Sequence, residues 1–135
     1  MFKIFTVVGA RPQFIKAAVV SRAFVKYRSD VQDILVHTGQ HYDANMSSVF
    51  FDELNIPHPK YNLNIWSWNH WEMTWKMLIS LEWILTEEMP DIVLVQWDTN
   101  TVLAWWIAAK KLWIKVGHVE AGLRSYDRSM PEEIN

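Results

Sequence analysis

The chain has 135 residues, enough for one domain with a core, and 50% of them are hydrophobic, as in ordinary globular proteins. Its 13 basic and 15 acidic residues nearly cancel and form no run of like charge, which argues against nucleic acid or a membrane surface as a partner. Cysteine is absent, so disulfides, thiolate metal sites and a cysteine nucleophile are excluded. No apolar run has the length of a membrane span or the pattern of a signal peptide, and we expect a cytoplasmic protein.

Apolar runs and helical repeats alternate through the first half of the chain. Residues 3–8 form a β-branched run that Gly9 ends, and residues 14–27 carry apolar side chains at helical spacing. A second apolar run, "ILVHTGQH", leads into "DANMSSVFFDEL", where Asp43 is a candidate helix N-cap. The two prolines of "NIPHPKYNLNI" predict a connecting loop.

The second half repeats the pattern. Residues 70–89 predict a long helix, which Pro90 ends, with one apolar face made of Met73, Met77, Leu78, Leu81, Ile84 and Leu85. A buried strand in "DIVLVQ", a helix in "NTVLAWWIAAKKL" and a further strand in "IKVGHVEAG" follow. The alternation predicts an α/β fold with a parallel sheet and helices on both faces.

Ligands of such sheets bind outside the carboxyl ends of the strands. The polar residues that follow the predicted strands are therefore candidates for a site. They are Arg11, His37, Gln40, His41, Asp98, Thr99, Asn100, His118, Glu120 and Arg124.

The first of these turns, Gly9-Ala10-Arg11-Pro12, matches neither the dinucleotide nor the Walker phosphate motif. Arg11 could hold a phosphate at the helix start, with Lys16 one turn further on, and a solvated loop arginine is an equally weighted alternative. In "HTGQHY", two histidines without a third ligand make a metal site a minor possibility. His37, Gln40 and His41 are better interpreted as forming hydrogen bonds with a ligand or within the turn itself.

Carboxylates at two strand ends are the strongest chemical signal. Asp98 and Glu120 end strands that we expect to be neighbours, so both would face one crevice, where burial and mutual repulsion raise the pKa of a carboxyl. Helix N-capping is an equally weighted alternative for Asp98. His118 and Arg124 could pair with Glu120 as purely structural partners.

Taken together, the motifs resemble one family over the whole chain. "GARPQFIK", "HTGQHYD", "VFFDELNIPHPKYNLNI", "PDIVLVQWDTNTVLA" and "HVEAGLRSYDRSMPEEIN" occur in the order found in non-hydrolysing UDP-N-acetylglucosamine (UDP-GlcNAc) 2-epimerases. The resemblance implies a Rossmann-like domain, the first half of a glycosyltransferase-B-like fold. It also implies conversion of UDP-GlcNAc to UDP-ManNAc by removal of the C2 proton with loss of UDP, followed by re-addition.

The resemblance also assigns residues and partners. Asp98, Glu120 and Glu132 match the family's acid/base carboxylates, and Arg11 and Lys16 match its basic residues; Gln40, His41 and Arg124 complete the expected substrate contacts. It implies a UDP-sugar partner, no cofactor or metal, a homo-oligomer in the full-length family and a role in cell-envelope polysaccharide synthesis. Residues 1–135 are expected to be the N-terminal domain, with the C-terminal UDP-binding domain absent and the chain alone inactive.

Two departures from the family pattern concern length and the first turn. The family's second domain, which contributes most of the UDP contacts and a further catalytic histidine, has no counterpart within these 135 residues. In the first turn the family usually has Thr and Glu where this chain has Ala10 and Gln13, and we expect that change to loosen a hydrogen bond.

A third departure concerns tryptophan. All nine Trp lie between Trp66 and Trp113, and residues 40–116 contain no Gly. The family motifs, roughly "GSGxHGxxTGxML", "VQGDTN", "LAG" and "KLGI", have Gly where this chain has Trp66, Trp68, Trp71, Trp75, Trp97, Trp105 or Trp106, and Trp113. Such exchanges indicate an engineered, mistranslated or wrongly recorded sequence. Among these residues, only Trp83 fits an ordinary place on the core face of a helix.

Two other functions remain as alternatives. The chain could be a non-catalytic or engineered α/β scaffold whose tryptophans mediate association. It could also be a hydrolysing epimerase or glycosyltransferase on the same fold, which the match at "HVEAGLRS" and "PEEIN" disfavours.

Overall fold

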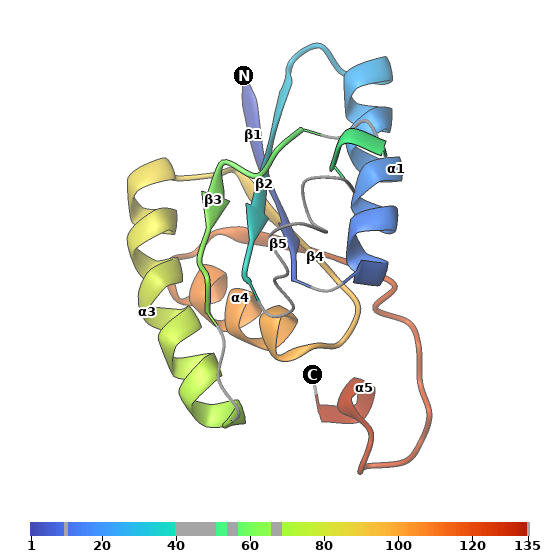
Figure 1. Ribbon diagram of the computed structural model, residues 1–135, viewed down its shortest axis with the longest axis vertical. Coiled ribbons are helices and arrows are strands. Elements are labelled where there is room, and N and C mark those ends of the chain that lie inside the picture. Colours follow the sequence, from blue (N-terminus) through green and yellow to red (C-terminus); the bar gives the residue numbers. More distant parts are fainter. Residues whose placement is uncertain (10, 40–50, 54–56, 66–68, 135) are drawn as a thin grey trace.

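The computed structural model describes residues 1–9, 11–39, 51–53, 57–65 and 69–134. Within these ranges five parallel strands form one sheet in the order β3-β2-β1-β4-β5 (Figure 1). The strands are β1 (Phe2–Val8), β2 (Val31–His37), β3 (Tyr61–Asn62), β4 (Ile92–Gln96) and β5 (Lys115–Val119). The helices are α1 (Arg11–Tyr27), α3 (His70–Glu88), α4 (Asn100–Lys111) and α5 (Pro131–Ile134).

Helices cover both faces of the sheet, as the sequence predicts. Alternate side chains of a strand point to opposite faces. Phe5 and Val7 of β1 belong to the core cluster shared with α3 and α4, whereas Val8 packs with Phe14 and Ala17 of α1. The Rossmann-like α/β prediction is therefore confirmed.

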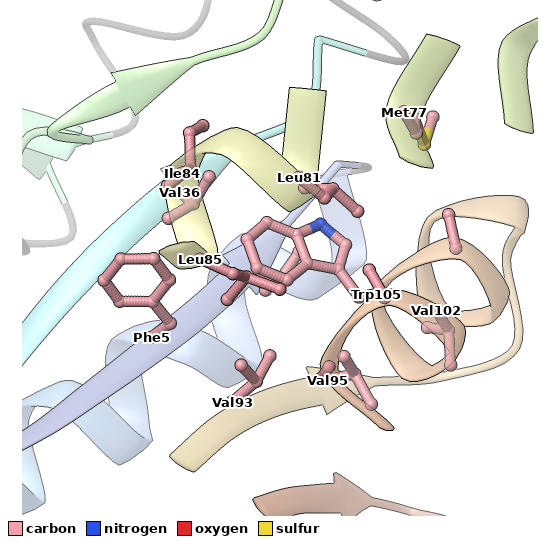
Figure 2. Close-up of a cluster of buried hydrophobic side chains, with 14 of the residues drawn as sticks. Phe5, Val36, Met77, Leu81, Ile84, Leu85, Val93, Val95, Val102 and Trp105 are labelled. Carbon is pink, nitrogen blue, oxygen red and sulfur yellow. The ribbon is translucent and has the colours of Figure 1, made fainter. Parts of the chain in front are cut away.

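The larger core lies under α3 and α4. The apolar face predicted for α3 is buried, except that Leu78 is only partly covered. Trp105 of α4 is fully buried, with its ring edge-on to Phe5 at 6.2 Å between centroids (Figure 2). Trp83 is 63% exposed, so its placement on the core face of α3 was wrong; among the described residues, Trp105 is the tryptophan that packs in the core.

One predicted loop contains a strand. Tyr61 and Asn62 pair with the carboxyl end of β2, where Lys60 N–H donates to Leu35 O and Leu63 N–H to His37 O, both at 2.9 Å. The prolines that predicted a loop precede these donors, so they remove no hydrogen bond from the ladder. The candidate N-cap Asp43 lies outside the described residues.

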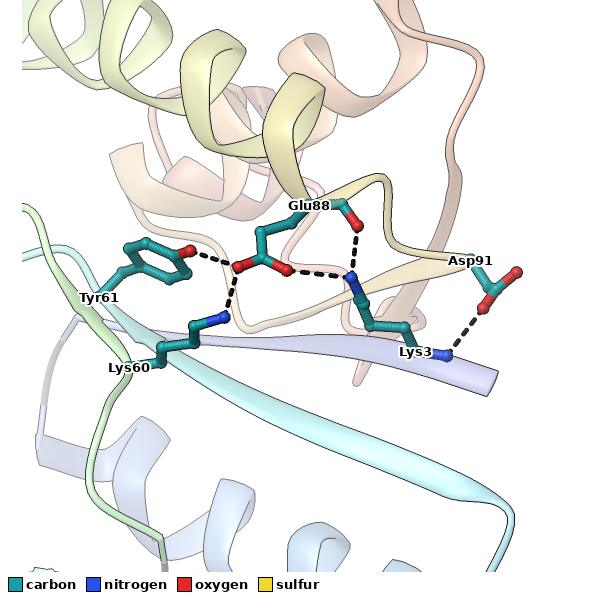
Figure 3. Close-up of polar contacts among 5 residues, drawn as sticks. All are labelled: Lys3, Lys60, Tyr61, Glu88 and Asp91. Carbon is teal, nitrogen blue, oxygen red and sulfur yellow. Dashed lines mark hydrogen bonds and ion pairs between the residues drawn. The ribbon is translucent and has the colours of Figure 1, made fainter. Parts of the chain in front are cut away.

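Hydrogen bonds to Glu88 connect the end of α3 with the sheet (Figure 3). Its carboxylate accepts hydrogen bonds from Lys60 Nζ at 2.5 Å, from Lys3 Nζ at 2.9 Å and from the Tyr61 hydroxyl. These donors lower the pKa of Glu88 to about 2. The donors also offset the unfavourable position of an anion at the carboxyl end of a helix.

We expect Glu88→Gln to destabilise the chain by about 1–2 kcal/mol at pH 7, because the charge-assisted bonds are lost. The pKa of Glu88 is lower in the folded state, so its contribution is present above about pH 4.5 and is lost as the pH falls toward 2. Urea unfolding at pH 7 and pH 3 measures both effects. Glu87→Gln, with the same charge change on an exposed neighbour, is the control; equal losses in the two variants would contradict the prediction.

Met89, the C-cap of α3, has left-handed backbone angles of φ 44° and ψ 60° and donates its N–H to Leu85 O at 3.0 Å. Because glycine adopts these angles without strain, Met89→Gly should raise the free energy of unfolding by about 0.5–1 kcal/mol. Glu87→Gly, within the helix, should lower it by about 1 kcal/mol. Urea midpoints give both values, and a destabilised Met89→Gly variant would refute the expectation.

The strand order positions the candidate site. From β1 the chain runs outward to β2 and β3, then returns to build β4 and β5 on the other side of β1. The carboxyl ends of β1 and β4 therefore flank a topological switch point, where ligands of open α/β sheets bind.

Candidate functional site

A cavity of 410 Å³ lies beyond the carboxyl ends of β4 and β5. Its polar lining consists of Asp98, His118, Glu120, Arg124, Glu132 and Glu133. The three carboxylates singled out from the sequence thus come together from three separate segments of the chain. Lys16 reaches Glu120 from α1, so the structure also brings together the predicted acidic and basic groups.

Strand pairing explains why two of these carboxylates meet. β4 and β5 are parallel neighbours, with Gln96 opposite Val119 and the Trp97 N–H donating to Val119 O at 3.4 Å. Asp98 and Glu120 follow these ends directly, as predicted. The alternative reading of Asp98 as an N-cap is wrong, because Thr99 is the N-cap of α4.

At Asp98 the surroundings of the carboxyl group favour its protonated form. Its pKa is raised, first by burial, then by a hydrogen bond to Glu132 and by the charge of Glu132. Two carboxyls that share a hydrogen bond hold a proton between them more readily than either does alone. Asp98 can therefore hold a proton that it could donate more readily than an unperturbed aspartate could.

Glu120 differs from Asp98 in its backbone and its partner. Its φ of 66° lies in the left-handed region that favours glycine. Its carboxylate accepts a hydrogen bond from Lys16 Nζ, an ammonium that also lies 5.1 Å from the centroid of the Trp97 ring. Strained backbone in a non-glycine residue clusters at functional sites, which makes Glu120 a candidate on structural grounds as well.

The structural partners predicted for Glu120 pair elsewhere. His118 Nε2 lies 2.6 Å from the Trp97 carbonyl oxygen, a contact in which the ring N–H donates. Arg124 is held by Glu133, with Nε to Oε1 at 3.0 Å and Nη2 to Oε2 at 2.7 Å. Lys16, which lies far away in the sequence, is the partner of Glu120.

Glu133 is a site residue that the sequence reading missed. Besides binding Arg124, its Oε1 accepts the N–H groups of Ser125 at 3.0 Å and Tyr126 at 3.1 Å. The hydrogen bond from Arg124, and after it those from the two N–H groups, lower the pKa of Glu133 to about 2. The carboxylate therefore fixes the 124–126 segment against α5 and places Glu132 beside Asp98. The two adjacent acids in "PEEI" could have indicated this role, since one carboxylate can accept hydrogen bonds from the loop while the other faces the cavity.

The first turn is held by Gln13. Its Oε1 accepts the Gly9 N–H at 2.7 Å, and its Nε2 donates to Gln96 O at 2.8 Å. No loosening is seen at Gln13, because its amide bridges the ends of β1 and β4 with a donor that a carboxylate lacks. Ala10 lies outside the described residues. Gly9 is needed here, since a Cβ would lie 2.5 Å from Thr38 Oγ1.

The structure describes the remaining predicted site residues only in part. Arg11 is the first residue of α1, and its side chain lies outside the described atoms, as do Gln40 and His41 entirely. In "HTGQHY", His37 Nδ1 accepts the Gly39 N–H at 2.8 Å, which is the local turn bond that the sequence allowed. Across the described ranges no three His, Asp or Glu side chains converge as a metal would require, and no described helix is long and apolar enough to cross a bilayer.

A second cavity of 600 Å³ opens on the other side of the turn after β4. Trp97 and Asp98 line both cavities, and His70, Asn100 and Leu103 contribute to the second. Asn100 Nδ2 lies 2.7 Å from His70 Nδ1, which links the starts of α3 and α4. The Trp97 side chain is therefore part of the wall beside Asp98 on both sides.

Relatives match the chain over nearly its whole length. The family model described as UDP-N-acetylglucosamine 2-epimerase matches residues 24–135. A UDP-N-acetylglucosamine 2-epimerase homolog of Methanococcus maripaludis is 58% identical over 133 residues, 98% of this chain and 36% of the relative. The UDP-2,3-diacetamido-2,3-dideoxy-D-glucuronate 2-epimerase of Pseudomonas aeruginosa is 53% identical over 133 residues, 98% of this chain and 37% of the relative.

The fold agrees with a solved structure. The Methanocaldococcus jannaschii UDP-GlcNAc 2-epimerase, crystallised in complex with UDP-GlcNAc and UDP, is similar with a TM-score of 0.91 at 54% identity, over 99% of this chain and 36% of that chain. The chain thus spans about 36% of the length of the relatives it matches. Because the family model matches most of its residues, the chain belongs to the UDP-N-acetylglucosamine 2-epimerase family.

Proposed function

We propose that this chain provides the acid/base carboxylates of a UDP-GlcNAc 2-epimerase, which interconverts UDP-GlcNAc and UDP-ManNAc. The observation that carries the proposal is the convergence of Asp98, Glu120 and Glu132 on one cavity at the carboxyl edge of the sheet. The raised pKa of Asp98 supports a proton-transfer role.

The reaction exchanges the proton at sugar C2. A carboxylate takes that proton, a C1–C2 double bond forms, and the C1–O bond breaks with its electron pair leaving on UDP. UDP then adds back to C1 while a protonated carboxyl delivers a proton to the opposite face of C2. Inversion therefore needs an acid and a base on opposite faces, which we assign to the Asp98–Glu132 pair and to Glu120 without fixing the order.

Positive charge is required where UDP leaves. We assign this role to Lys16 and Arg11, which lie in the first two turns of α1 beside the carboxyl end of β1. The N–H groups at the start of that helix favour the same anion. Arg124, with Gln40 and His41, is proposed for substrate binding, and Glu133 orients its guanidinium.

The match covers only 36% of the length of the Methanococcus maripaludis homolog. We therefore expect part of the catalytic cleft to be formed by another domain. We propose that residues 1–135 form the first of two domains of a glycosyltransferase-B-like enzyme, with most UDP contacts made by the second. The isolated chain should then be inactive. A homo-oligomeric, cytoplasmic enzyme of cell-envelope polysaccharide synthesis remains the broader prediction.

A chimera tests the function. Residues 1–135 replace the matching segment of the Methanocaldococcus jannaschii enzyme, and UDP-GlcNAc is incubated in D₂O with the chimera, the chain alone and the intact relative. Formation of UDP-ManNAc with deuterium at C2 in the chimera is the expected result. Because Trp97 lines the cavity, a W97G chimera is assayed in parallel. If both chimeras fold and bind UDP but exchange no C2 proton, the proposal fails.

The sugar itself can be tested in the same assay. The Pseudomonas aeruginosa relative is named for a UDP-2,3-diacetamido glucuronate, and its 53% identity equals that of a UDP-GlcNAc 2-epimerase from Methanococcus maripaludis. Both sugars carry a 2-acetamido group at the reacting carbon, so the same carboxylates could serve either. We propose UDP-GlcNAc; a higher kcat/KM for the diacetamido glucuronate would reassign the substrate.

The scaffold alternative has one observation in its favour. Trp71, Trp75, Trp83, Trp106 and Trp113 are exposed, as a surface for association would require. It predicts concentration-dependent oligomers in analytical ultracentrifugation and no conversion of UDP-GlcNAc by the chimera. A chimera that binds and converts the sugar would exclude it.

A further inference from the structure

Two of the described tryptophans, Trp97 and Trp113, have a backbone conformation that suits glycine. Trp97 has φ 72° and Trp113 has φ 61°, angles that cost an L-residue roughly 1–2 kcal/mol and that glycine adopts freely. These angles do not depend on family resemblance.

Trp113 sits in a helix-ending motif that normally contains glycine. After the C-cap Leu112, the Trp113 N–H donates to Lys110 O at 3.2 Å and the Ile114 N–H to Ala109 O at 2.9 Å. This pair of bonds defines the Schellman motif, in which the residue after the cap is usually glycine. The Trp113 side chain is 94% exposed, so it gains almost nothing in packing for its strained backbone.

Most of the other tryptophans also bury little of their side chains, so the large indole adds little to the stability of the fold. Trp71, Trp75, Trp83 and Trp106 are exposed on α3 and α4, although large aromatic side chains are usually well covered. Trp105 is buried, but its indole N–H has no hydrogen-bond partner among the described residues, which is costly in a core. Trp66 and Trp68 lie outside the described residues.

Composition supports the same reading. Four glycines are about 3% of the chain, below the usual share of about 7%; counting the nine tryptophans as glycine gives about 10%. Random substitution of glycine codons would yield Ala, Val, Ser, Arg, Cys, Asp and Glu, because only GGG reaches a tryptophan codon in one step. Repeated exchange of glycine for tryptophan alone indicates one codon that is translated as glycine in one genetic code and as tryptophan in another.

We propose that these nine positions are encoded by UGA, which some genetic codes read as tryptophan and others as glycine, and that the source organism inserts glycine. The protein made there has a glycine turn between β4 and Asp98, with no indole in the two cavities or beneath Lys16. That turn leaves the face of Asp98 open to a ligand. This last consequence rests on the proposed function, whereas the decoding does not.

The gene and the natural protein provide the direct test. We expect UGA at all nine codons, and tryptic peptides of the protein from its source organism whose masses match glycine. UGG codons, or peptides with the mass of tryptophan, would overturn the proposal. Neither readout depends on catalysis, so failure of the proposed activity leaves it untouched.

Unfolding of the recombinant chain tests the backbone evidence. W113G should raise the folding equilibrium constant about five- to thirtyfold, because strain is removed and the exposed indole makes few contacts. W97G removes the same kind of strain but also the contact of the indole with Lys16, so a smaller rise is expected. W83G, an exposed tryptophan within α3 where glycine weakens the helix, is the matched control and should lower it about two- to fivefold. If W97G and W113G destabilise the chain as W83G does, the structural case for glycine is refuted.

Discussion

Replacing Glu120 with glycine should stabilise the chain and abolish epimerisation by the chimera. The stability gain is expected because φ at this position is 66°, and glycine relieves a strain of roughly 1 kcal/mol. The lost ion pair with Lys16 is an exposed one and subtracts about 0–1 kcal/mol. Loss of an acid/base carboxylate should lower kcat by about 10²–10⁴. Backbone strain at a residue that turnover requires is typical of a functional position.

Matched variants separate the two effects. Glu120→Gln removes the charge but keeps the strained backbone, so it should lose activity without gaining stability. Tyr126→Gly relieves a similar φ of 59° outside both cavities and should gain stability while it retains activity. Urea midpoints and C2 deuterium exchange in the chimera give the two readouts. Near-normal exchange by Glu120→Gly would remove Glu120 from the proposed chemistry.

Most of the fold could be predicted because it follows from local pattern. Apolar runs such as residues 92–96 give strands, and the face formed by Met77, Leu81 and Leu85 gives a helix with one buried side. β3 could not be predicted, because two residues carry no periodicity and their ladder bonds come from β2. Whether Trp105 or Trp83 enters the core depends on the packing of α3 against α4, which neither helix specifies alone.

The candidate site was predictable to the extent that it depends on strand order. Asp98 and Glu120 follow paired strands, so position alone placed them together. Glu132 needed the family resemblance, because α5 reaches the cavity through a segment without repeating pattern. The partner of Glu120 was not predictable, since Lys16 is 104 residues away and a carboxylate can pair with any cation that the fold brings close to it.

Acid should destabilise the folded chain through the buried imidazole of His37. His37 is 1% exposed, its ring stacks on Phe14 at 5.2 Å, and its Nδ1 accepts the Gly39 N–H. A ring that accepts at Nδ1 is neutral, and burial lowers the pKa of His37 from 6.5 to about 4. Protonation would place a charge in the core and remove the acceptor of the turn.

The sign and the range of the effect follow from the two pKa values. Above about pH 6.5 the imidazole is neutral in both states, so the pH has no effect through this group. Between pH 6.5 and 4 the unfolded chain binds a proton that the folded chain does not, so the free energy of unfolding falls by about 3 kcal/mol in total. This range overlaps that of Glu88 only between about pH 4 and 4.5, so most of the two losses can be measured separately.

Urea unfolding at half-unit steps from pH 7.5 to 4 measures the loss. His37→Asn keeps an acceptor for the Gly39 N–H without a titrating group, and should flatten the curve by about 3 kcal/mol across the range even if it is less stable at pH 7. His58→Asn removes an exposed imidazole paired with Asp52 and should leave the acid-dependent loss in place. If the His37→Asn chain retains the full loss, the acid sensitivity arises elsewhere and the buried imidazole is not its source.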